Sequence, residues 1–233
     1  MKIVITGASR GLGFSMAEAF AKEGHDLYLT SLSEVKLYHA LESLMSRFPD
    51  QQIKAKPFQL GSEKGAKEFG KWVLEQTGEV DILINNAGSF EPGQVMNEPE
   101  GQLEKMLNIN LLSAYHLTRS LLPAMVKRKA GHIFNISSIA GLVAYKNGGS
   151  YSISKFALSG FSKNLREELK PHLIKVTCIY PGAIYTDSWS GSGVSPDRIM
   201  KTSDIADTIV QISKLSPQAV VEELVIRPLA GDL

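Results

Sequence analysis

The feature that most constrains this chain is an end-to-end alternation of short, apolar, β-branched runs with longer segments of helical periodicity. This alternation is typical of stacked βαβ units, because parallel strands need long crossover connections between them. The predicted strands are Lys2–Thr6, Asp26–Thr30, Ile53–Gln59, Asp81–Asn85, His132–Ile136, Lys175–Tyr180 and Ala219–Ile226. The predicted helices are Leu12–Glu23, Glu34–Phe48, Glu63–Gln76, Glu100–Lys129, Tyr151–Lys170 and Ser203–Leu215. We therefore expect one α/β domain over residues 1–233, a doubly wound parallel sheet of about seven strands with helices on both faces.

Charge and apolar patterning exclude several classes of partner. Lys and Arg number 25 against 24 Asp and Glu, so a net charge of +1 provides no field for nucleic acid or an anionic membrane. No apolar run approaches the roughly 20 residues of a membrane span, and three apolar residues before the first polar turn are too few for a signal peptide. A single cysteine, Cys178, suits a reducing compartment. We expect a soluble cytoplasmic protein without nucleic-acid or membrane partners.

Three glycines in the spacing Gly-x-x-x-Gly-x-Gly follow the first predicted strand and open the first helix. Gly7, Gly11 and Gly13 permit a tight turn and a close approach of backbone amides to a pyrophosphate. The helix that begins there adds about half a positive charge at its N-terminus. This context predicts a dinucleotide site.

The end of the second strand bears on which dinucleotide is bound. An acidic residue there would bond the ribose 2′-hydroxyl of NAD and repel the 2′-phosphate of NADP, but the strand ends Leu29-Thr30-Ser31-Leu32-Ser33. Arg10, inside the glycine turn, could form a charge-assisted bond with that phosphate. NADP(H) is therefore favoured over NAD(H); the alternative interpretation is that Arg10 is a solvated surface side chain.

Tyr151 and Lys155 lie four residues apart at the start of a helical segment and so share one helical face. A tyrosine of pKa about 10 is a poor acid or base near neutrality. An ammonium about 4 Å away, at an effective dielectric constant of about 20, contributes roughly 4 kcal/mol, or about three pKa units before desolvation. Ser137 and Ser138 follow the fifth strand, where a hydroxyl could polarise a carbonyl oxygen. Taken singly, each of these features is as well explained by packing.

Six segments in order carry a resemblance to the short-chain dehydrogenase/reductase family that runs nearly end to end. They are TGASRGLG at Thr6–Gly13, NNAG at Asn85–Gly88, NIN at Asn108–Asn110, NISS at Asn135–Ser138, YSISK at Tyr151–Lys155 and PGAIYTD at Pro181–Asp187. The resemblance implies a Rossmann-type fold and hydride transfer between a nicotinamide and a carbonyl/alcohol pair, with no metal.

Residue roles follow from the resemblance position by position. Tyr151 donates a proton to the substrate oxygen, and Lys155 lowers the pKa of Tyr151 and bonds the nicotinamide ribose. Ser138, with Ser137 as the fallback, polarises the carbonyl, and Asn110 holds a water of a proton relay. The pyrophosphate and 2′-phosphate are expected at Gly7, Ser9, Arg10, Gly11, Leu12 and Gly13, the adenosine ribose at Asn86, Ala87 and Gly88, and the nicotinamide end at Pro181, Gly182, Ile184 and Thr186.

Two loops at carboxyl ends of strands, Ser89–Pro99 and Asp187–Asp197, could line a ligand crevice or be ordinary surface loops. We expect the substrate pocket at Ser89–Val95, Ala140–Tyr145 and Asp187–Val194, with Tyr145, Tyr185 and Trp189 as apolar walls. The expected substrate is a small or medium ketone, diketone or 3-oxoacyl compound. The rival hypothesis is a non-catalytic NADP-binding redox sensor.

One departure from the family pattern concerns adenine. Gln59 stands after the third strand where relatives usually have Asp, so an adenine contact there loses its charge. The resemblance also implies a homodimer or homotetramer through the helices at 100–129 and 151–170. Apolar residues there fit such an interface and intramolecular packing equally well: Leu103, Leu107, Leu111, Phe156, Phe161 and Leu165.

Overall fold

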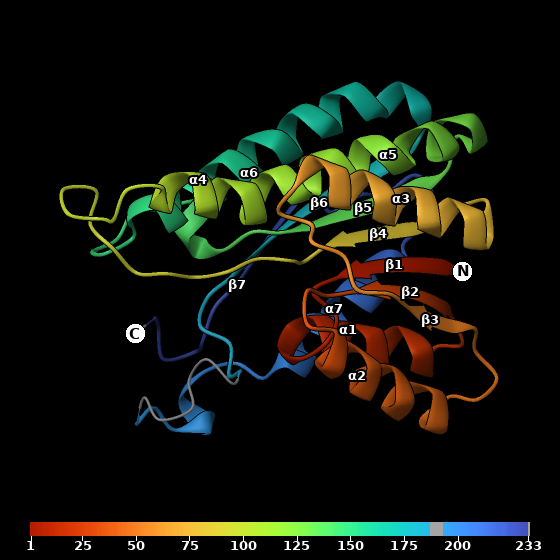
Figure 1. Cartoon of the computed structure of the whole chain (residues 1–233), viewed down its shortest axis with the longest axis horizontal. Helices are drawn as coiled ribbons and strands as arrows, with labels where there is room; N and C mark the ends of the chain where they lie inside the picture. The colour runs from red at the N-terminus through yellow and green to blue at the C-terminus, as the bar shows by residue number, and fades with distance from the viewer. Residues whose placement is uncertain (187–192, 233) are drawn as a thin grey trace.

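A seven-stranded, wholly parallel sheet organises the computed structural model, which describes residues 1–186 and 193–232 (Figure 1). Its strands are β1 (Lys2–Thr6), β2 (Asp26–Thr30), β3 (Ile53–Ala55), β4 (Ile82–Asn85), β5 (Gly131–Ile136), β6 (Ile174–Pro181) and β7 (Glu223–Ile226). They lie in the order β3-β2-β1-β4-β5-β6-β7. The prediction of a doubly wound parallel sheet is confirmed.

Helices cover both faces of this sheet (Figure 1). One layer holds α1 (Gly11–Lys22), α2 (Glu34–Arg47) and α7 (Thr202–Ser213), and the other holds α3 (Glu63–Thr77), α5 (Ser113–Arg128) and α6 (Gly149–Leu169). Neighbouring strand residues point to opposite faces, so Ile3 and Ile5 pack in the first layer while Val4 packs in the second. Short 3₁₀ turns lie at Ile139–Gly141, Lys170–His172 and Pro196–Arg198.

Three predicted elements differ from the observed ones. The strand predicted over Ile53–Gln59 ends at Ala55, because Pro57 has no N–H to donate to the ladder. The strand predicted from Ala219 begins at Glu223. Just before it, the Glu222 carbonyl accepts from the Cys178 amide and the Val221 carbonyl accepts from Thr177 Oγ1. The helix predicted over Glu100–Lys129 is divided into α4 (Gln102–Leu107), a π-helical turn (Asn108–Leu112) and α5.

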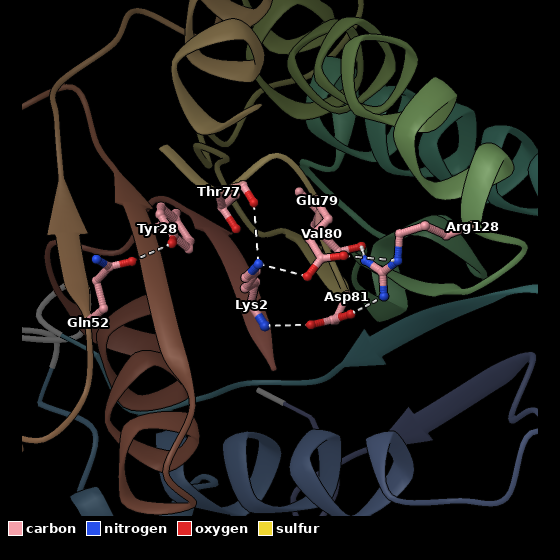
Figure 2. A network of polar contacts seen from close by, with 8 residues as sticks. All are labelled: Lys2, Tyr28, Gln52, Thr77, Glu79, Val80, Asp81 and Arg128. Carbon is pink, nitrogen blue, oxygen red and sulfur yellow. Dashed lines mark hydrogen bonds and ion pairs between the residues drawn. The ribbon is translucent and has the colours of Figure 1, made fainter. Parts of the chain in front are cut away.

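An ion-pair network joins the amino ends of β1 and β4 to the end of α5 (Figure 2). The Lys2 amide donates to Asp81 Oδ2 at 2.7 Å and its ammonium to Glu79 Oε1 at 2.7 Å, while Arg128 Nη2 donates to Asp81 Oδ1 at 2.5 Å. Burial raises the pKa of Asp81, but the bonds from Arg128 and Lys2 outweigh it and hold that pKa below its usual value. The network ties strand to helix at the edge opposite the carboxyl ends of the strands.

None of the helices in the described residues combines the length and the apolar character that a membrane span requires.

Candidate active site

A cavity of about 220 Å³ opens at the carboxyl ends of β1 and β4. These two strands are adjacent in the sheet, and the chain passes outward from them in opposite directions, which is where open α/β sheets bind ligands. The cavity is lined by Gly7, Arg10, Gly11, Leu12, Gly13, Asn86, Gly88 and Thr186. All eight lie among the residues predicted to bind the cofactor.

The glycines have the geometry that a pyrophosphate site needs. Gly7 and Gly11 adopt φ angles of +67° and +54°, in the left-handed region. A Cβ on Gly13 would lie 2.2 Å from the Gly7 carbonyl oxygen, so this glycine lets α1 approach β1. The first turn of α1 has no acidic residue, and its N-cap, Arg10, makes no side-chain capping bond. The positive end of α1 thus fits an anionic group in the cavity.

Thr6 is a site residue that sequence reasoning missed. Its Oγ1 accepts hydrogen bonds from the backbone amides of Asn86 (2.9 Å) and Ala87 (2.8 Å), and Asn86 Nδ2 donates to the Thr6 carbonyl at 2.9 Å. These bonds hold the loop after β4 against the glycine turn. Ala87 does not line the cavity itself, but its amide helps to fix the loop that does. The sequence did contain a signal for Thr6, because it is the first residue of the first of the six family-like segments.

Ser9, another predicted cofactor residue, lies outside the cavity lining. Its Oγ is 2.8 Å from Ser31 Oγ, so two hydroxyls meet where the glycine turn passes the end of β2. The exposed side chain of Arg10 follows Ser9 in the chain. Hydroxyls and a guanidinium can all donate to a phosphate.

The segment after β6 brings one further predicted residue, Thr186, into the cavity. Pro181 is buried as the last residue of β6, Gly182 N donates to the Ile226 carbonyl at 2.8 Å, and Ile184 packs against the core. These three residues hold the backbone that places Thr186 in the cavity lining. Trp189 and the rest of 187–192 lie outside the described residues.

A neighbouring hollow of about 410 Å³ shares Gly11 and Thr186 with the first cavity. Sequence reasoning assigned no role to most of its other residues. Its remaining lining is Phe14, Ser15, Glu18, Tyr185 and Thr202.

Tyr151 and Ser138 meet beside the carboxyl end of β5. Burial raises the pKa of Tyr151 above its usual value, and hydrogen bonding with the Ser138 hydroxyl opposes that shift. The expected lowering of this pKa by Lys155 is wrong for this structure. Lys155 Nζ donates instead to the Ile136 carbonyl at 3.0 Å and lies 5.8 Å from the centroid of the Tyr151 ring.

Lys155 itself is buried, and burial lowers its pKa to about 8. Ile136 O is the one acceptor of its ammonium within the described residues, which leaves donor capacity unused. Nζ lies 3.6 Å from where a Cβ on Gly88 would stand. The spare donors therefore lie next to the cavity wall, where a hydroxyl-bearing ligand such as a ribose would fit.

The two adjacent serines have different surroundings. Ser137 is buried, and its Oγ donates to the Lys155 carbonyl and contacts Ser159 Oγ, both at 3.2 Å. Ser138 is half-buried, accepts from the Ala140 amide at 3.1 Å and interacts with Tyr151. This favours Ser138, the residue predicted, over the fallback Ser137.

Asn110 lies in the π-helical turn, and its side chain is buried. Its Oδ1 accepts from the Ser89 amide at 2.8 Å, while Nδ2 donates to Ser89 O at 3.1 Å and to Ser154 Oγ at 2.9 Å. Asn110 thus ties the loop after β4 to α6. π-turns of this kind occur frequently at functional sites.

Comparison with known proteins agrees with this geometry. The model of the short chain dehydrogenase family matches residues 1–194. A sepiapterin reductase of Chlorobaculum tepidum is 28% identical, covering 99% of this chain and 97% of the relative.

Two solved structures are similar over the whole of this chain. An alcohol dehydrogenase of Thermococcus sibiricus, complexed with 5-hydroxy-NADP, has a TM-score of 0.91 at 27% identity and is covered over 98% of its length. An L-sorbose reductase of Gluconobacter frateurii, complexed with NADPH and L-sorbose, has a TM-score of 0.88 at 26% identity and is covered over 96%.

Proposed function

The chain belongs to the short-chain dehydrogenase family, and from this premise we propose that it is an NADP-dependent reductase of a small or medium carbonyl compound. Membership makes it an oxidoreductase of the CH–OH/C=O pair. One observation carries the proposal: Tyr151, Ser138 and Lys155 gather beside a glycine-lined cavity that fits a dinucleotide.

Tyr151 and Ser138 act on the substrate oxygen in this proposal. Because burial raises the pKa of Tyr151, its hydroxyl is protonated near neutrality and can donate a proton to that oxygen. The Ser138 hydroxyl donates a hydrogen bond to the same oxygen and stabilises the negative charge that develops there.

Lys155 and Asn110 support this chemistry. Lys155 uses its spare donors on the nicotinamide ribose. Asn110 fixes the position of the loop after β4, and in this proposal it also holds a water that links Lys155 to solvent. When bound, NADP(H) supplies or accepts the hydride.

The choice of NADP(H) over NAD(H) rests on charge. Arg10 lines the cavity, and the end of β2 presents Ser31 rather than an acid. The similar structures that contain 5-hydroxy-NADP and NADPH support the same choice. A sensor that binds NADP without turnover is not favoured, because Tyr151, Ser138 and Lys155 are all present and close together.

The test measures NADPH consumption against ketones, diketones, aldehydes and 3-oxoacyl thioesters, with NADH in parallel. Tyr151→Phe is expected to fold and bind NADPH while losing turnover by about 100- to 10,000-fold. Tyr115→Phe is the matched control, because the Tyr115 hydroxyl bonds Arg119 on α5, away from the site.

Three outcomes decide the matter. Turnover that prefers NADPH and disappears in Tyr151→Phe establishes the reductase. Retention of most activity in Tyr151→Phe contradicts the role of Tyr151, whereas tight NADPH binding without turnover on any substrate favours the sensor.

We also propose that the protein self-associates as a homodimer or homotetramer through α4 and α6. Leu103, Ile153 and Phe156 are exposed there, which supports an interface, whereas Leu165 is core and Phe161 packs against it. A monomer in light scattering would contradict this. A cytoplasmic location is proposed on the single buried thiol of Cys178.

A further inference from the structure

The long connection between β4 and α4 is attached to the first turn of α6, the helix that carries Tyr151 (Figure 1). Within this connection, Glu98 Oε1 accepts a 2.8 Å hydrogen bond from the Ser150 amide, and the Ser150 hydroxyl donates to Glu98 Oε2. The first amides of a helix have no partner inside the helix, and a carboxylate there is favoured by the helix dipole. Glu98 therefore caps α6 from 52 residues away.

Two glycines make room for this carboxylate. A Cβ on Gly149 would stand 2.0 Å from Glu98 Oε1, and a Cβ on Gly93 would stand 2.6 Å from the same atom. The connection is also held by the Gly93 amide, which donates to the Asn147 carbonyl at 3.1 Å, and by Gln94 Nε2, which donates to Asn147 Oδ1 at 2.9 Å. The space that the Glu98 carboxylate occupies is thus formed by the connection itself and by the start of α6.

The same connection presents Phe90 to Tyr151. The two rings meet edge to face, with centroids 4.8 Å apart and an interplanar angle of 82°, and Phe90 remains 55% exposed. Tyr145 lies within the electrostatic reach of Tyr151, since burial and then the charge of Tyr151 raise the pKa of Tyr145 to about 12. Val143, two residues earlier, is 69% exposed. The ring of Tyr151 therefore has an exposed aromatic neighbour in Phe90, while its hydroxyl interacts with Ser138.

We propose that Glu98 is a positioning residue that holds Phe90 against Tyr151, so that the site selects ketones carrying a bulky apolar group. The inference rests on the proposed function, because it assigns a substrate class to that site. Glu98 touches neither substrate nor cofactor. It acts by fixing the connection that supplies the apolar wall.

The test compares two ketones, a short four-carbon ketone and an aryl ketone, in steady-state kinetics with NADPH. In Glu98→Ala, kcat/KM for the aryl ketone is expected to fall about tenfold, mainly through KM, while the value for the short ketone changes less than about twofold. Glu98→Gln retains an oxygen acceptor for the Ser150 amide and is expected to restore most of the loss. Phe90→Ala should reproduce the loss, and the double variant should lose no more than either single one.

Glu100→Ala is the matched control, because Glu100 is an exposed carboxylate two residues along the chain. Equal losses on both ketones in Glu98→Ala and Glu98→Gln, or no loss in either, would overturn the proposal. Hydrogen exchange of 89–99 and of the Ser150 amide provides a readout without turnover. Faster exchange is expected in Glu98→Ala and not in Glu100→Ala, and unchanged exchange overturns the attachment itself. A wild-type chain that reduces neither ketone refutes the substrate class, and absence of turnover on the wider carbonyl panel refutes the proposed function.

Discussion

Lys155 and Tyr151 lie one turn apart on α6, yet the Lys155 ammonium is directed to the Ile136 carbonyl, 3.0 Å away, and stands 5.8 Å from the Tyr151 ring centroid. The ammonium is buried, and burial lowers its pKa to about 8. An amine that is charged at neutral pH and buried in this way destabilises the fold. Stability alone would therefore not favour a lysine at position 155, the position to which we assign a role in the reaction.

Lys155→Met is expected to abolish turnover. It should also raise the free energy of unfolding at pH 7 by about 2 kcal/mol, which is the gain from removing a buried charge less the lost hydrogen bond to the Ile136 carbonyl. Below pH 8, the lysine is protonated in both folded and unfolded chains. Between pH 8 and about 10.5, the unfolded chain binds the proton more tightly, so the stability of the wild type rises with pH relative to the variant. Urea unfolding at pH 7 and pH 10 should show that the gap in the free energy of unfolding between Lys155→Met and the wild type narrows by about 2 kcal/mol. A gap independent of pH would mean that burial does not lower the pKa of Lys155.

Gly13→Ala is expected to destabilise the fold by about 1–3 kcal/mol and to weaken NADPH binding. The new Cβ would meet the Gly7 carbonyl oxygen at 2.2 Å and Asn86 Nδ2 at 2.7 Å, and neither the glycine turn nor β1 can move without disturbing the cavity. Gly160→Ala on α6 is the matched control. Nothing lies within 4 Å of its Cβ position, so a small gain of up to about 1 kcal/mol is expected there. Thermal unfolding and NADPH titration of both variants would check the contrast, and equal effects would contradict it.

The sequence was sufficient for the sheet and for the lining of the cavity, because both depend on local patterns. Alternation of apolar residues places Ile3 and Val4 on opposite faces, and the glycine spacing places Gly7 and Gly13 at a strand-to-helix turn. The end of β3 was mispredicted, although Pro57 was visible, because the apolar pattern continues past it to Phe58.

What could not be predicted depends on atoms brought together from distant positions. No spacing rule connects Glu98 to Ser150, and none indicates that Lys155 would bond Ile136 rather than approach Tyr151. The shift in the pKa of Tyr151 was predicted with the wrong sign for the same reason. A four-residue spacing gives a shared helical face, whereas burial and side-chain direction decide the pKa.

Arg10→Ala is expected to raise the dissociation constant for NADPH about tenfold and to change that for NADH less than about twofold. A hydrogen bond to a charged group contributes about 1.5–3 kcal/mol, and Arg10 lines the cavity beside the Ser9–Ser31 pair. Arg119→Ala, an exposed arginine on α5, is the control. Fluorescence titration with both cofactors measures the effect. Equal losses for NADPH and NADH would place Arg10 at a group that the two share, and equal wild-type affinities would remove the NADP preference.

His132 makes the fold sensitive to acid. It is buried on β5, where its Nε2 lies 2.7 Å from Thr177 Oγ1, and burial lowers its pKa to about 3. Because Thr177 Oγ1 donates to the Val221 carbonyl, it accepts from a neutral imidazole N–H. Between pH 6.5 and pH 3, the unfolded chain binds a proton that the folded chain does not, so the free energy of unfolding falls as pH falls.

This slope approaches about 1.4 kcal/mol per pH unit, which predicts a loss of about 2 kcal/mol between pH 7 and pH 5 from His132 alone. His132→Gln keeps an N–H donor for Thr177 and cannot gain a proton in this range, so its stability should fall by that much less over the same interval. His39→Gln, at an exposed position on α2, should follow the wild type. Urea unfolding of the three proteins at pH 7 and pH 5 gives the comparison. If His132→Gln lost as much stability as the wild type between pH 7 and pH 5, His132 would not be the source of the acid sensitivity.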